Sequence, residues 1–121
     1  MPFDWREYLN LAQFLFDNAD KSSFSEQSAL RSAVSRAYYA AFCYARDYAQ
    51  AKQGFMPDFT AEDHTRIRIH FEQKQMINMA DRLDRLRHWR NQCDYRNEAF
   101  RLRDTAKDAV ALAIRVIDGL K

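Results

Sequence analysis

Glycine and proline are scarce in this sequence, with two of each among 121 residues. A β-rich protein needs many turns, and tight turns depend on these two residue types. Their scarcity argues against sheets and for a few long helices. The length fits one domain, and a hydrophobic fraction of 47% can supply its core. We therefore expect residues 1–121 to form a single all-α domain.

Long apolar runs and metal-ligand patterns are also missing. No stretch reaches the roughly 18 apolar residues of a membrane span, and the chain does not start like a secretory signal. Cys43 and Cys93 fall inside helical patterns, so we interpret them as free, reduced thiols of a cytoplasmic protein. His64 and His70 are six positions apart, which does not place them one helical turn apart. We expect no metal site and no cofactor.

The sequence has almost no excess of either charge, because its 19 basic and 17 acidic residues leave a formal net charge of only +2. This value excludes a generic nucleic-acid or membrane binder. Residues 82–103, however, hold seven arginines against three acidic residues, a local charge of +4. One interpretation is a solvated helix face with the i,i+4 pairs Asp81–Arg85 and Asp84–His88. The other is a shallow basic groove for a phosphate backbone or an acidic partner.

Hydrophobic spacing predicts an up-and-down bundle of four main helices plus one short helix. Asp4 and Glu7 form a candidate capping box for the first helix, and Ser25 is the expected cap of the second. A break containing Gly54 precedes the short helix. The predicted ranges are about 4–18, 25–53, 60–71, 76–95 and 102–120.

The second predicted helix is apolar at nearly every position between residues 37 and 45. We expect it to be central and buried on several sides, and we expect a homodimer to cover it. Its aromatic residues are interpreted as core or dimer packing: Tyr38, Tyr39, Phe42, Tyr44 and Tyr48.

Arg90 falls on the apolar side of the fourth predicted helix, in line with Leu83 and Leu86. A buried arginine is costly unless it is paired, and Asp94 one turn later is the natural partner. This pair is either structural or part of a functional site. Tyr95 lies about 140° around the helix from Arg90, so it reaches the same side only where the helix ends.

Two segments resemble signatures of the HEPN family. Residues 90–95, R-N-Q-C-D-Y, resemble its R-N-x-x-D-Y signature, and residues 35–42, S-R-A-Y-Y-A-A-F, resemble its S-x-x-Y-Y-A-x-F signature. The resemblance covers nearly the full chain and implies a small helical domain of the kind paired with minimal nucleotidyltransferases. Many family members are metal-independent ribonucleases whose dimers bring together motifs in which a histidine follows the arginine.

No histidine follows Arg90 here, and Tyr95 stands at the fifth position after it. A tyrosine with a pKa near 10 is a poor base at neutral pH, although its ring can stack on a base. The resemblance thus implies a toxin–antitoxin-like partner that binds nucleotide, RNA or protein. The alternatives are an atypical ribonuclease and a helical adaptor without a site. The candidate catalytic residues are Arg90, Tyr95 and Asp94, and the candidate binding residues are Arg90, Asn91, Tyr95, Ser35 and Tyr38.

Overall fold

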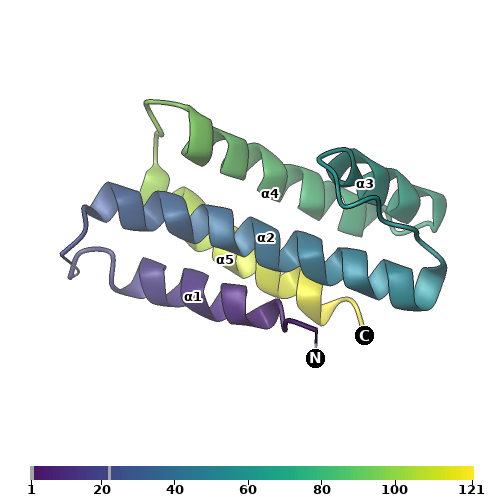
Figure 1. Ribbon diagram of the computed structural model, residues 1–121. Helices are drawn as coiled ribbons and strands as arrows, with labels where there is room; N and C mark the ends of the chain where they lie inside the picture. The colour runs from purple at the N-terminus through teal and green to yellow at the C-terminus, as the bar shows by residue number, and fades with distance from the viewer. Residues whose placement is uncertain (1, 22) are drawn as a thin grey trace.

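A computed structural model describes residues 2–21 and 23–121. This part of the chain forms five α-helices and no strand: α1 (Arg6–Asp17), α2 (Glu26–Gln53), α3 (Asp63–Gln73), α4 (Ile77–Tyr95) and α5 (Leu102–Asp118). The long helices α1, α2, α4 and α5 alternate in direction, and the short α3 lies beside the start of α4 (Figure 1). The predicted all-α bundle of four main helices and one short helix is confirmed.

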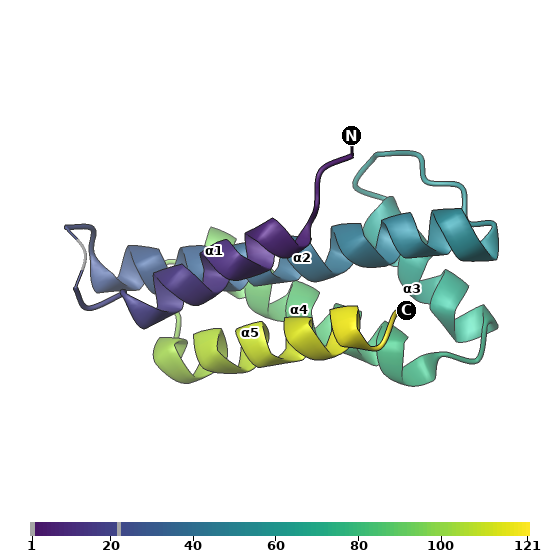
Figure 2. The ribbon, with the colours of Figure 1, turned by 90° about the horizontal axis from the view of Figure 1, so that it is seen from below.

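Helix α2 is the centre of the molecule and contacts each of the other four helices. Alanines at four-residue spacing are fully buried along it, and their small side chains let neighbouring backbones come close: Ala33, Ala37, Ala41, Ala45 and Ala49. Figure 2 shows α1 along the first part of α2; α5 contacts α1, α2 and α4, and α4 contacts α2 and α5. Because one chain already covers α2, its apolar character gives no reason for a dimer. The homodimer stays a prediction.

The ends of α2 follow from local chemistry. The Ser25 side chain accepts a hydrogen bond of 3.0 Å from the backbone N–H of Ser28, which satisfies one of the free donors of the first turn. Gly54 ends the helix in the left-handed region at φ 73°, where glycine has no Cβ to clash. Both boundaries agree with the sequence prediction.

Helix α4 is ended by Arg31, which reaches across from α2. Its guanidinium donates to the carbonyl oxygens of Cys93, Arg96 and Asn97 at 2.8, 2.6 and 3.0 Å. The last carbonyls of a helix lack partners and carry partial negative charge, so a cation stabilises them. This contact fixes the end of α4 at Tyr95 and so sets where the Tyr95 side chain leaves the helix.

Two predicted helix starts are wrong. The first helix begins at Arg6 rather than at residue 4, and the expected capping box does not form. The Asp4 carboxylate instead accepts hydrogen bonds from the backbone and side chain of Arg6. The third helix begins at Asp63 rather than at residue 60, because the chain before it folds around the Asp63 carboxylate.

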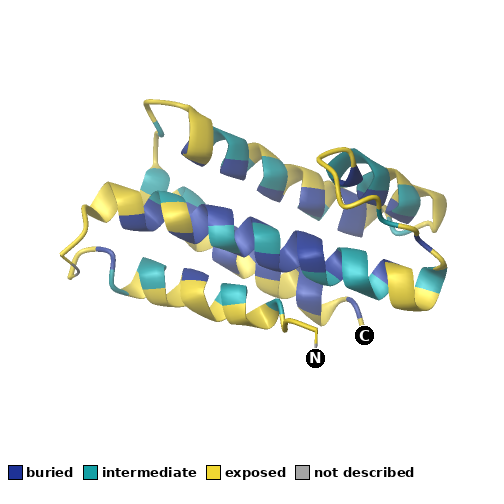
Figure 3. Cartoon of the chain, in the orientation of Figure 1, coloured by how far each residue is buried: buried dark blue, intermediate teal, exposed yellow. Residues whose placement is uncertain are grey.

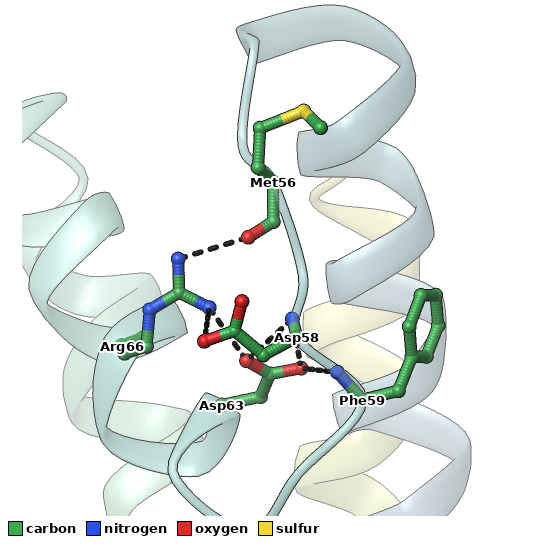
Figure 4. Close-up of polar contacts among 5 residues, drawn as sticks. All are labelled: Met56, Asp58, Phe59, Asp63 and Arg66. Atoms are coloured by element: carbon green, nitrogen blue, oxygen red, sulfur yellow. Dashed lines mark hydrogen bonds and ion pairs between the residues drawn. The ribbon is translucent and has the colours of Figure 1, made fainter.

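Figure 4 shows this Asp63 network at the start of α3. The carboxylate accepts from the backbone N–H groups of Asp58 and Phe59 and from Arg66 at 2.7 Å. The second arm of Arg66 donates to the carbonyl of Met56. Burial raises the pKa of Asp63, but these hydrogen bonds outweigh burial and hold the pKa below its ordinary value. The network fixes the first turn of α3 against the preceding loop.

Buried positions line the facing sides of α2, α4 and α5, and exposed positions cover their outer sides (Figure 3). Cys43 and Cys93 are both buried and unpaired, as expected for free thiols. Within the described residues, every helix is too short or too polar to cross a membrane.

Candidate functional site

Arg90 is buried on the inner side of α4, as the sequence predicts. Its side chain is only 8% exposed. The guanidinium carbon lies 5.4 Å from the ring centroids of both Tyr38 and Tyr39 and 5.7 Å from that of Tyr95. Aromatic faces attract a cation at such distances, so three tyrosines surround this charge.

The expected pair of Arg90 with Asp94 is also confirmed, although it is loose. The Arg90 Nη1 atom lies 3.8 Å from an Asp94 carboxylate oxygen and donates to the Tyr95 hydroxyl at 3.3 Å. The Nε atom of Arg90 is buried and has no hydrogen-bond partner. A buried cation normally needs short, complete hydrogen bonding. The charge of Arg90 is therefore only partly compensated.

Tyr95 lies at the surface with 75% of its area exposed. It reaches Arg90 because α4 ends at this residue, which is the condition that the helical angle imposes. Its ring covers the guanidinium from the solvent side, while Tyr38 is fully buried. Tyr95 is thus the part of this cluster that a ligand can contact first.

Ser35 and Tyr38 lie behind the surface rather than on it. Ser35 is buried, and its hydroxyl donates to Asp94 at 3.3 Å while accepting a weak contact from Arg36 at 3.5 Å. It holds the carboxylate that pairs with Arg90. Both side chains support the neighbouring polar groups, and neither is open to a ligand in this structure.

His64 of α3 also belongs to this cluster, and no pattern in the sequence predicts this. Its Nδ1 atom shares a hydrogen bond with the Tyr38 hydroxyl, and its ring stacks on Phe42 with centroids 4.2 Å apart. Burial, together with the charges of Arg87 and Arg90, lowers the pKa of His64 to about 4. The imidazole is therefore neutral at pH 7.

The contact with Tyr38 assigns the tautomer of His64. Burial raises the pKa of Tyr38, so the hydroxyl keeps its proton. This buried hydroxyl has no other hydrogen-bond partner among the described residues, so we assign it as the donor to Nδ1. A neutral imidazole that accepts at Nδ1 carries its own proton on Nε2. His64 thus offers one N–H donor in a defined position.

Arg87, one turn before Arg90, is a second incompletely paired cation. Its Nη1 atom donates to the Thr65 hydroxyl at 3.3 Å, and its buried Nε atom lacks a partner. No ion pair involves Arg87 among the described residues. The cluster therefore carries an excess of positive charge, which favours an anionic ligand.

Asn91 does not join the other candidate binding residues. It lines a shallow groove on the outer side of α4, whose charges are mixed rather than basic: Asp81, Asp84, Arg85, Arg87, His88 and Asn91. Asp84 pairs with Arg68 of α3 at 3.6 Å instead of with His88, so the expected i,i+4 contact is replaced by one between helices. This groove gives little support to a basic phosphate track.

Comparison with known proteins adds no further constraint. Searches of protein-family models, curated proteins and solved structures find no match to this chain. Among the described residues, no group of three His, Cys, Asp or Glu side chains could hold a metal ion. The arrangement consists of two arginines, a neutral histidine and an exposed tyrosine, which together can bind an anion beside an aromatic ring.

Proposed function

We propose that this chain is a HEPN-type helical module that binds a nucleotide or RNA through the Arg90–Tyr95 region. The observation that carries the proposal is the buried guanidinium of Arg90, whose loose ion pair and unpaired Nε leave hydrogen-bonding capacity. A phosphate would complete its pairing, and the exposed ring of Tyr95 offers a stacking surface for a base.

The proposal also covers the cellular location, the oligomeric state and the partner protein of the chain. By its resemblance, the domain acts in the cytoplasm as one half of a toxin–antitoxin-like or defence pair, as a homodimer and with a minimal nucleotidyltransferase as partner protein. Co-purification of the two proteins tests the pairing, and sedimentation at micromolar concentration tests the dimer. A monomer that does not bind the nucleotidyltransferase would contradict this part of the proposal. The binding site would still need its own test.

Fluorescence anisotropy with a short single-stranded RNA and with nucleoside monophosphates tests the binding site. Arg90→Gln should weaken binding by roughly tenfold or more, the effect of losing one charge-assisted contact. Arg85→Gln is the matched control, because Arg85 is exposed on the same helix. Equal affinities for the two folded variants would show that ligand binding, if any, lies elsewhere.

A metal-independent ribonuclease is the second candidate, and His64 is the observation that favours it. An imidazole beside two arginines is the kind of group that moves protons during RNA cleavage. With a pKa of about 4, however, His64 is a weak base at pH 7. We expect little cleavage of a labelled RNA pool without metal. Strong cleavage that His64→Gln or Tyr95→Phe abolishes would reverse the order of the two candidates.

A further inference from the structure

Arg87 and Arg90 lie close to His64, because Arg87 donates to the neighbouring Thr65 and Arg90 lies over the ring of Tyr38, whose hydroxyl contacts His64. Neither arginine has a short ion pair among the described residues. Arg87 has no ion pair in the described part of the chain, and Arg90 has only the contact of 3.8 Å with Asp94. Asp63, the neighbour of His64, is already committed to Arg66 and to two backbone N–H groups. An anion beside Arg87 and Arg90 would therefore meet two cations. The carboxylates that remain near them are Asp94 and, in the groove that Arg87 also lines, Asp81 and Asp84.

The structure also fixes how His64 can take part. Tyr38 from α2 occupies Nδ1, and the ring is held by stacking on Phe42. The Asp63 network in Figure 4 anchors the first turn of α3, and His64 is the next residue along the chain. The charged and titratable groups near the imidazole are Tyr38 and Tyr39 from α2, Asp63 from α3, and Arg87 and Arg90 from α4.

We propose that Arg87, Arg90 and His64 together form a subsite for one phosphate-type oxyanion, with His64 acting as a neutral N–H donor through Nε2. The inference rests on the proposed function and assigns its phosphate-binding residues. Guanidinium groups suit such an anion because each offers several donors in a plane, and a tetrahedral dianion has enough oxygens for all three side chains. The buried, unpaired Nε atoms show that neither guanidinium has its full set of hydrogen-bond partners in this structure.

Titration with inorganic sulfate and inorganic phosphate tests the subsite on the full chain, followed by NMR of the histidine side-chain nitrogens. The His64 signals should show the Nε2–H tautomer and shift on addition of either anion. A nucleoside monophosphate should produce the same shift, and the nucleoside without phosphate should not. This pair of ligands distinguishes a free anion from a nucleotide phosphate that also contacts Tyr95.

The variants His64→Phe and His64→Gln separate the donor from the ring. His64→Phe should weaken sulfate binding about five- to tenfold, whereas His64→Gln, which keeps an N–H donor, should retain most of it. His70→Phe is the matched control on the same helix, because His70 contacts Gln53 on a different side and should leave affinity unchanged. Loss of sulfate binding in the control to the same extent would show a structural effect and overturn the assignment.

The pH dependence completes the test, since sulfate keeps its charge between about pH 5 and about pH 8 while an ordinary histidine does not. A neutral His64 predicts flat affinity over that range. Sulfate affinity that rises as the pH falls would show a cationic histidine and overturn the inference.

RNA binding that depends on Arg90 but not on His64 would also overturn the inference while leaving the proposed function intact. RNA binding without any sulfate or phosphate binding would have the same meaning. If Arg90→Gln bound RNA as tightly as the unchanged protein, the proposed function itself would be wrong.

Discussion

Among the arginine–aspartate pairs of the molecule, Arg66–Asp63 and Arg90–Asp94 differ in how completely their hydrogen bonds are satisfied. In the Arg66–Asp63 pair the closest atoms are 2.7 Å apart, and the carboxylate also accepts from two backbone N–H groups. In the Arg90–Asp94 pair they are 3.8 Å apart, and the Arg90 Nε atom has no partner. The first pair is a closed network that fixes a loop. The second retains capacity for another ligand, which is why we assign function to it.

Asp63→Asn should have the largest effect on stability. The amide cannot accept all the hydrogen bonds that the carboxylate accepts, so we expect a loss of about 2–3 kcal/mol in the free energy of unfolding. Urea denaturation measures it. Asp58→Asn is the control, because Asp58 contacts the same arginine but is exposed, and it should cost less than about 1 kcal/mol. Equal costs would contradict the closed network around Asp63.

Arg90→Met should cost less, about 1 kcal/mol, through lost contacts with the surrounding tyrosines. The sequence led us to expect a larger penalty from a carboxylate left buried and alone. Asp94 is exposed, so water can solvate it when Arg90 is removed. Urea denaturation of this variant beside Asp63→Asn compares the two pairs directly. A cost for Arg90→Met above that of Asp63→Asn would show that Arg90 is mainly structural.

Stability should fall as the pH falls from about 6.5 to about 4, and His64 should contribute to this slope. Its pKa is lowered from 6.5 to about 4 in the folded chain, so the unfolded chain takes up the proton first. Below about pH 4 both states are protonated, and His64 contributes no further loss. Urea denaturation at several pH values, with His64→Gln for comparison, measures the slope. An unchanged slope in the variant would show that His64 is not neutral in the folded protein.

Tyr95→Phe should have the smallest effect on stability, within about 0.5 kcal/mol, because the side chain is exposed and loses one long hydrogen bond. Its ring still covers Arg90, so RNA binding should also change little if stacking is the main contribution. Tyr95→Ala provides the contrast, with weaker RNA binding expected. If Tyr95→Phe binds as poorly as Tyr95→Ala, the hydroxyl rather than the ring contacts the ligand.

The sequence predicted what depends on local spacing. The helices, the cap at Ser25, the break at Gly54 and the pairing of the buried Arg90 with Asp94 all follow from patterns within about one or two turns. It did not predict contacts between distant segments. His64 meets Tyr38 only because α3 packs beside α2, and no motif around either residue indicates this contact. The role of Arg31 at the end of α4 was missed for the same reason.

The central position of α2 has a consequence for how the molecule opens. Backbone amides along its buried alanines should exchange with deuterium only when the whole bundle unfolds, because α1, α4 and α5 all pack on α2. Helix α3 packs mainly on α4, so its amides should exchange through a smaller, local opening. Such an opening would carry His64 away from Tyr38 while the four long helices stay assembled.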